Sequence, residues 1–187
     1  MKVIKTNLQG VYILVPKVFG DKRGWFTESW SDRELVSRGL HYIFVQDNHS
    51  YSAAKGVLRG LHVQKGEYSQ AKLVRCVRGT VLDVAVDLRQ GSPTYKQWVS
   101  IELSAENHRQ LLIPRGFAHG FMTLTDDTEF LYKADNYYEP RAERSIIWND
   151  PDIGINWGNA SPIMSEKDMN AYPLKDCDID FKYEVKK

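Results

Sequence analysis

The segment TVLDVAVDL, residues 80–88, alternates between apolar and acidic side chains. Every even-numbered position from 82 to 88 is apolar, whereas Asp83 and Asp87 fall on the odd-numbered positions. Successive side chains of an extended chain point to opposite faces, so a period of two indicates a β-strand. The segment therefore predicts a strand with one apolar face and two carboxylates on the other.

Short segments rich in β-branched and aromatic residues recur along most of the chain, and Gly, Pro, Asn and Asp separate them. Many short strands with frequent turn residues are typical of an all-β sandwich or barrel. Besides residues 80–88, we expect strands in VYILV (11–15), WFTESW (25–30), YIFVQ (42–46), VLRGLHVQ (57–64), KLVRCVRG (72–79), WVSIEL (98–103), RQLLIP (109–114), FMTL (121–124) and TEFLYKA (128–134).

Helices are expected to be few and short. Ser31 followed by Glu34 forms a capping box, which predicts a helix that ends near Gly39. Ser165 followed by Asp168 can open another, after a loop at residues 149–162 that is rich in Gly, Asn and Pro. We therefore expect an all-β domain with short helices mostly at the C-terminal end.

Length and composition limit the possible classes of protein. The 187 residues suit one domain, 1–187, with a single core. Lys and Arg number 25 against 24 Asp and Glu, so nothing in the net charge of +1 attracts nucleic acid or an anionic membrane. The N-terminus lacks the pattern of a signal peptide, and Cys76 and Cys177 stand in unrelated contexts. We expect a soluble cytoplasmic protein that binds neither nucleic acid nor membrane.

The segment RGLH, residues 59–62, together with Lys72, places a histidine and two cations inside predicted strands. Buried charges are costly unless they are paired, so this cluster indicates a functional site unless its cations lie at a sheet edge. Strict alternation would put Arg59 and His62 on opposite faces. A bulge at Gly60 would turn both toward one cavity.

The segment IPRGFAHG, residues 113–120, resembles the second conserved box of the cupin superfamily, whose fold is a small double-stranded β-helix. Metal-binding cupins supply two histidines separated by one residue, and then a glutamate, from their first box. Here the corresponding residues are His62, Val63 and Gln64, and an amide is a poor ligand beside a missing imidazole. We therefore expect neither a metal nor another cofactor, and we expect His62 to act as an organic acid or base.

Five segments in order make the resemblance more specific: PKVFGDKRG (16–24), FVQDNHS (44–50), VLRGLH (57–62), QAKLVRC (70–76) and FLYK (130–133). Together they resemble the dTDP-4-dehydrorhamnose 3,5-epimerase family over about residues 3–170. The resemblance implies a metal-free cupin jelly roll, usually a homodimer, that converts dTDP-4-dehydro-6-deoxy-D-glucose in the route to dTDP-L-rhamnose.

The resemblance also implies roles for four catalytic residues. His62 matches the family's base and Tyr132 its acid, on opposite faces of the sugar. Lys72 matches the cation that stabilises negative charge on the C4 oxygen, and Asp168 the carboxylate that orients His62. Taken singly, each has an ordinary structural explanation, such as helix capping for Asp168.

Further positions match family residues that contact the diphosphate, the nucleoside or the sugar. Arginine suits phosphate because its planar guanidinium can donate two parallel hydrogen bonds. In the family pattern, the strand from Arg23 to Glu28 is exchanged between subunits and completes the partner's site. The matching positions are Arg23, Glu28, Gln46, Asp47, Asn48, Arg59, His119, Glu143 and Lys167.

Three alternative functions stay open. A related epimerase could invert only C3 or only C5, and the presence of His62 and Tyr132 does not by itself require both inversions. A non-catalytic cupin could bind a nucleotide sugar, although a pure binder needs no acid opposite a base. A metal-dependent cupin oxygenase or isomerase is disfavoured by Gln64.

Overall fold

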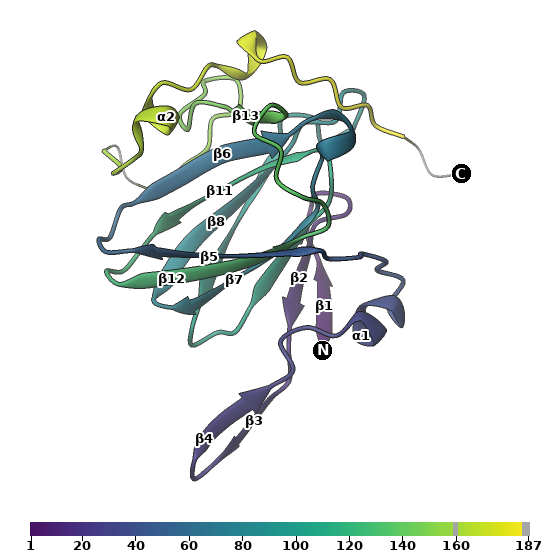
Figure 1. Cartoon of the computed structure of the whole chain (residues 1–187), viewed down its shortest axis with the longest axis vertical. Coiled ribbons are helices and arrows are strands. Elements are labelled where there is room, and N and C mark those ends of the chain that lie inside the picture. The colour runs from purple at the N-terminus through teal and green to yellow at the C-terminus, as the bar shows by residue number, and fades with distance from the viewer. Residues whose placement is uncertain (159–160, 185–187) are drawn as a thin grey trace.

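Two β-sheets packed face to face form the body of the molecule in the computed structural model, which describes residues 1–158 and 161–184 (Figure 1). The all-β jelly-roll prediction is confirmed. The six-stranded sheet has the order β1 (Lys2–Lys5), β2 (Tyr12–Val15), β10 (Gln110–Ile113), β7 (Lys72–Arg78), β12 (Thr128–Ala134) and β5 (Gln46–Ser52). The five-stranded sheet has the order β13 (Glu143–Ser145), β6 (Leu58–Gln64), β11 (Phe117–Thr123), β8 (Thr80–Asp87) and β9 (Trp98–Ser104).

A separate hairpin of β3 (Val18–Asp21) and β4 (Gly24–Thr27) projects from the body near the N-terminal strands (Figure 1). Its apolar side chains are largely exposed, including Phe19, Trp25 and Phe26. Monomeric proteins rarely expose such a cluster without a function for it.

The helices begin at the two serines that the sequence indicated. The hydroxyl oxygen of Ser31 accepts from the Glu34 N–H at the start of α1 (Asp32–Val36), and Ser165 does the same for Asp168 at α2 (Glu166–Met169). With the 3₁₀ turns Gly66–Tyr68 and Leu174–Asp176, two of the described helical segments lie before residue 70 and two lie after residue 165. No helix in the described ranges is long and apolar enough to span a membrane.

The TVLDVAVDL segment forms β8 as predicted, and both of its faces are buried. Val84 and Val86 face outward into a cluster covered by the C-terminal segment, whereas Ala85 packs between the sheets. Asp83 and Asp87 share this inner face and are fully buried. The alternation therefore distinguishes two buried faces of the strand, one toward the C-terminal segment and one between the sheets, and neither face is exposed to solvent.

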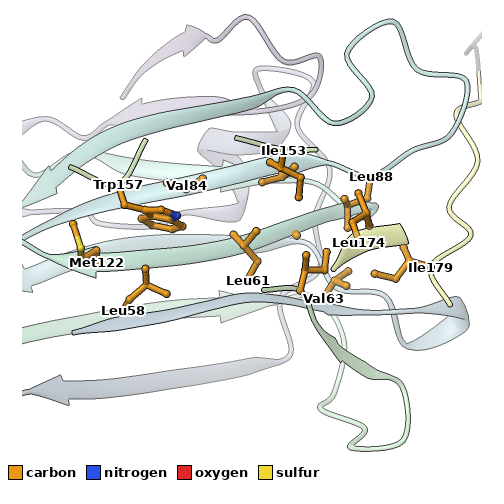
Figure 2. Close-up of a cluster of buried hydrophobic side chains, with 13 residues drawn as sticks. Leu58, Leu61, Val63, Val84, Leu88, Met122, Ile153, Trp157, Leu174 and Ile179 are labelled. Carbon is orange, nitrogen blue, oxygen red and sulfur yellow. The ribbon is translucent and has the colours of Figure 1, made fainter. Parts of the chain in front are cut away.

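The outward cluster joins the five-stranded sheet to the C-terminal segment (Figure 2). Leu61 and Val63 of β6 pack there with Trp157 and Leu174 from the later part of the chain. Burying one such side chain contributes roughly 1.5–3 kcal/mol. The cluster thus fixes the segment that carries α2 above β6.

The strand expected at residues 42–46 is wrong, because β5 begins only at Gln46 and continues to Ser52. Tyr42 and Phe44 instead pack against the outer face of the six-stranded sheet, beside Trp30. Residues 42–45 are apolar because they form a loop that covers the sheet, whereas the polar segment that follows them forms the edge strand β5.

The short strands β1, β3 and β13 were not predicted. The loop at residues 149–162 is irregular as expected, and its positions 159–160 lie outside the described residues.

Candidate active site

A register shift in β6 turns Arg59 and His62 toward the same side. His119 of β11 pairs with His62 of β6, and Phe121 pairs with Arg59. The two pairs are two residues apart on β11 but three residues apart on β6, so β6 carries one extra residue. Gly60 lies in this bulge with φ +128°, and a Cβ there would come within 2.6 Å of the Cα of Gly120. Only glycine fits this conformation and this close approach. The expected bulge is therefore present.

The bulge opens onto a cavity of about 410 Å³ between the two sheets. The five-stranded sheet contributes Arg59 and His62 from β6 and His119 from β11, and the six-stranded sheet contributes Lys72 and Tyr132. Its wall is completed by Ser50, Val57, Leu58, Phe121, Ile163, Met164, Ser165, Lys167 and Asp168. The candidate base and the candidate acid thus come from opposite sheets.

His62 is paired with Asp168. The Nε2 of His62 lies 2.6 Å from the Oδ1 of Asp168, and the other carboxylate oxygen accepts from the Gly60 N–H at 3.4 Å. Burial of Asp168 opposes its ionisation, but the hydrogen bond from His62 leads the contacts that keep its pKa below the ordinary value. An ionised partner on Nε2 leaves the Nδ1 lone pair of His62 free to take a proton.

His119 forms a second pair with a carboxylate. Its Nε2 lies 2.9 Å from the Oδ2 of Asp83, and both side chains are almost entirely buried. Burial lowers the pKa of His119 against the opposing charge of Asp83, and the charges of Lys72 and His62 lower it further. His119 therefore favours its neutral form.

Lys72 and Tyr132 share the opposite wall, with the Lys72 Nζ 5.5 Å from the centre of the Tyr132 ring. Burial lowers the pKa of Lys72 to about 8, although Glu143 and Asp83 act in the opposite direction. Burial and the charge of Glu143 raise the pKa of Tyr132, while Arg59 lowers it in part. At pH 7, the amine is thus mostly a cation and the phenol stays protonated.

The rim of the cavity carries Arg59, Lys167 and Glu143. Arg59 donates to the Tyr51 carbonyl at 3.1 Å and forms no ion pair within the described part of the chain, so its charge is available for an anion. Lys167 binds the Glu143 carboxylate at 2.6 Å. Burial opposes ionisation of Glu143, yet bonds from Lys167 and Tyr138 keep its pKa below the usual value.

Besides Glu143, which borders the cavity through Lys167, five predicted substrate-binding residues lie outside it. Arg23 is exposed on the hairpin and pairs with Asp21, and Glu28 follows β4. Asp47 and Asn48 of β5 line a separate cavity of about 150 Å³. The last of the five is Gln46 of β5, whose amide nitrogen donates to Asn48 and whose amide oxygen accepts from the backbone N–H of Tyr138.

Sequence reasoning missed three residues that organise the site. Asp83 was noted only as part of a strand pattern, although a buried carboxylate needs a partner and thus signals one. Gln64 was considered only as a failed metal ligand, yet its amide makes three hydrogen bonds. The hydroxyl of Tyr138 donates to Glu143 at 2.7 Å, a contact with no signal in the sequence.

No group of three His, Cys, Asp or Glu side chains in residues 1–158 and 161–184 is arranged to hold a metal ion. At the position of the second histidine of the cupin motif, the Oε1 of Gln64 already accepts from the Glu139 N–H at 2.6 Å. The residues at this position therefore do not suit metal coordination.

The fold is that of a cupin, and its cavity is lined by titratable side chains from both sheets. A family model described as dTDP-4-dehydrorhamnose 3,5-epimerase matches residues 5–176. The chain belongs to this family, and it is an isomerase.

Individual relatives agree with this assignment. The dTDP-4-dehydrorhamnose 3,5-epimerase of Salmonella typhimurium is 59% identical, with 94% of this chain and 96% of the relative covered. A Legionella pneumophila crystal structure in complex with dTDP-4-keto-L-rhamnose has a TM-score of 0.94 at 44% identity, covering 98% and 99% of the chains. A 3'-monoepimerase from Streptomyces bikiniensis in complex with dTDP-quinovose has a TM-score of 0.85 at 34% identity, covering 91% and 86%.

Proposed function

We propose that this protein inverts C3 and C5 of dTDP-4-dehydro-6-deoxy-D-glucose and so produces dTDP-4-dehydro-L-rhamnose for dTDP-L-rhamnose biosynthesis. The observation that carries the proposal is the placement of His62 and Tyr132 on opposite sheets around one cavity. The whole chain, 1–187, would act as one domain, because the C-terminal segment supplies Asp168 to a site built on β6.

The first step is removal of a proton next to the ketone. The C4 carbonyl acidifies the hydrogens on C3 and C5, and the Nδ1 of His62 takes one of these protons. The electrons of the broken C–H bond move to the C4 oxygen and form an enolate. Asp168 stabilises the imidazolium that results, because its carboxylate is hydrogen-bonded to Nε2.

The second step returns a proton to the same carbon from the other face of the ring. The Tyr132 hydroxyl donates it, which restores the ketone and inverts the carbon. Solvent then reprotonates the phenolate of Tyr132 and accepts the proton from His62. The same cycle at the second carbon completes the conversion without any oxidant or reductant.

Cations match the charges of the proposed substrate. Lys72, with its charge on the same wall as Tyr132, stabilises the developing negative charge on the C4 oxygen. Arg59 at the rim has no carboxylate partner in the described residues and suits the diphosphate. Lys167 supplies a second rim cation, which is shared with Glu143.

Proton NMR in deuterated water tests the proposal, with dTDP-4-dehydro-6-deoxy-D-glucose as substrate and with or without a strong chelator. We expect deuterium at both C3 and C5, at rates that the chelator leaves unchanged. Tyr132→Phe should retain some exchange while losing inverted product, because His62 still removes the proton.

Exchange at only one carbon would instead support a single-carbon epimerase, a possibility that the fold similarity to a 3'-monoepimerase keeps relevant. Binding of the sugar nucleotide without exchange would support the non-catalytic cupin. Loss of exchange on chelation would overturn the metal-free mechanism.

We further propose a homodimer in which the β3–β4 hairpin of each chain enters the partner's site. Phe19, Trp25 and Phe26 are exposed on the hairpin, and β5 forms one edge of the six-stranded sheet. An unpaired edge readily accepts a further strand. This arrangement would bring the partner's copies of Arg23 and Glu28 to a site that the single chain leaves without them.

Mixing two inactive variants tests this exchange. His62→Gln removes the base but keeps the hairpin, whereas Arg23→Ala alters the hairpin but keeps the base. After refolding together, mixed dimers should recover activity in one of their two sites. Failure to recover activity, or sedimentation as a monomer, would contradict the exchange.

A further inference from the structure

The segment between β12 and β13, residues 135–142, carries Tyr138. The Tyr138 hydroxyl donates to the Oε2 of Glu143 at 2.7 Å, and Lys167 binds the same oxygen at 2.6 Å. This hydrogen bond is the main cause that raises the pKa of Tyr138 to about 12. The position of the segment therefore sets the position of a rim carboxylate and of the cation bound to it.

Gln64 fixes this segment from the end of β6. Its Nε2 donates to the carbonyl of Tyr137 at 3.1 Å and to the carbonyl of Tyr68 at 2.7 Å. Its Oε1 accepts from the backbone N–H of Glu139 at 2.6 Å. The side chain is almost entirely buried, so all three bonds lie where water competes poorly.

The backbone of β6 places Gln64 on the side of the sheet that holds the proposed base. Gln64 follows His62 by two residues, so both side chains point to the same face. Opposite Gln64 in the strand register lies Glu143. One glutamine is thus in register with the rim carboxylate and hydrogen-bonded to the backbone on both sides of Tyr138.

We propose that Gln64 is a positioning residue that holds Tyr138, Glu143 and Lys167 in the arrangement that binds substrate. The proposal rests on the proposed function for its substrate, and it assigns Gln64 no contact with the reacting carbons. Gln64 acts through the backbone of residues 137–139, so its loss should weaken substrate binding more than it slows proton transfer.

The chemistry of the contacts requires an amide at this position. Two of the three bonds are donated to carbonyl oxygens and the third is accepted from an N–H. A carboxylate of the same shape can accept but not donate, and it would also lie opposite Glu143. A methionine has a similar volume and replaces none of the three bonds.

Two variants and one control measure the role. For Gln64→Met and Gln64→Glu we expect KM to rise about tenfold while kcat falls less than about threefold, because only contacts away from the reacting atoms change. Gln70→Met is the matched control, because the Nε2 of Gln70 donates to the neighbouring carbonyl of Asn136 at 2.8 Å but does not reach residues 137–139. Its KM and kcat should stay within about twofold of the wild-type values, since the Gln64 contacts remain.

Hydrogen exchange provides a readout that needs no substrate. The Glu139 N–H should exchange about tenfold faster in Gln64→Met than in the wild-type protein, since it loses a buried acceptor. In Gln70→Met, this amide should exchange at the wild-type rate. Calorimetric titration with dTDP alone should show the same weakening in the Gln64 variants as KM does.

The outcomes separate the two proposals. If the wild-type protein binds dTDP without exchanging C3 or C5, the proposed function fails, while dTDP affinity and amide exchange still test Gln64. Unchanged exchange at Glu139, an equal rise in KM for Gln70→Met, or a fall in kcat with constant KM would each overturn the positioning role.

Discussion

Two histidine–aspartate pairs lie side by side, and both of their histidines line the cavity. The pairs have the same composition but differ in the element that supplies the carboxylate and in how far the histidine is buried. His62 and His119 are register partners on β6 and β11. The carboxylate of His62 comes from α2 in the C-terminal segment, and that of His119 comes from the neighbouring strand β8. The His62 side chain is 28% exposed, whereas that of His119 is 7% exposed.

Under the proposed function, this difference in burial gives the two pairs different tasks. Burial first, and then the charges of Lys72 and His62, lowers the pKa of His119, so its neutral form dominates. A buried neutral imidazole is suited to a fixed hydrogen bond. The more accessible His62, with a carboxylate on its far nitrogen, is suited to proton exchange with substrate and solvent.

The largest expected effect comes from replacing each imidazole with an amide. His62→Gln should lower deuterium exchange at C3 and C5 by at least about 10³-fold, because a general base typically contributes 10²–10⁴-fold. His119→Gln should lower it by roughly tenfold, since an amide can still donate to Asp83. Initial exchange rates measured by NMR compare the two variants. Equal losses would show that the two pairs share the proton transfer.

Changing the two carboxylates should separate turnover from stability. Asp168→Asn should lower kcat about 10²-fold, because a neutral amide no longer stabilises the His62 imidazolium. Asp83→Asn should keep kcat within about tenfold but reduce the free energy of unfolding by about 1–3 kcal/mol, as expected for a disturbed buried hydrogen bond. Single-turnover kinetics and urea unfolding provide these values. If Asp83→Asn lowered kcat more than Asp168→Asn does, the assignment of proton transfer to the His62 pair would be contradicted.

The effect that is smallest near neutral pH is a pH dependence from Lys72, whose charge helps to keep His119 neutral. Burial lowers the pKa of Lys72 to about 8, so its amine is mostly protonated below pH 8 and mostly neutral above it. The stabilising charge is thus lost as the pH rises through 8, and kcat/KM should fall about tenfold per unit beyond it. A profile from pH 6 to 10 tests this. A rate that climbs across the same range would rule out the charged amine.

Local rules predicted much of the fold from the sequence. The alternation in residues 80–88 identified β8, Ser31 and Ser165 identified both α-helix starts, and Gly60 indicated the bulge. Each of these signals depends on a few neighbouring residues. The strand prediction for residues 42–46 failed because, over five positions, an apolar loop that covers a sheet has the same sequence pattern as a buried strand.

The candidate site was only partly predictable. The structure brings His62, Lys72, Tyr132 and Asp168 together, whereas their catalytic roles stay predictions. Asp83 and Gln64 were missed because their importance lies in partners 36 and 75 residues away, His119 and the Glu139 backbone. Arg23 and Glu28 do not line the cavity of the single chain, and their predicted role depends on the proposed partner subunit.

The pairing of His62 with Asp168 joins residues 106 positions apart in the chain. The ribosome therefore synthesises the base long before its carboxylate, and the strands from β7 to β13 are made in the interval. The nascent chain can assemble its sandwich but cannot complete the pair until α2 has emerged. The pair is thus completed only after α2 is made, and under the proposed function chains that stop before Asp168 are not expected to act on the sugar.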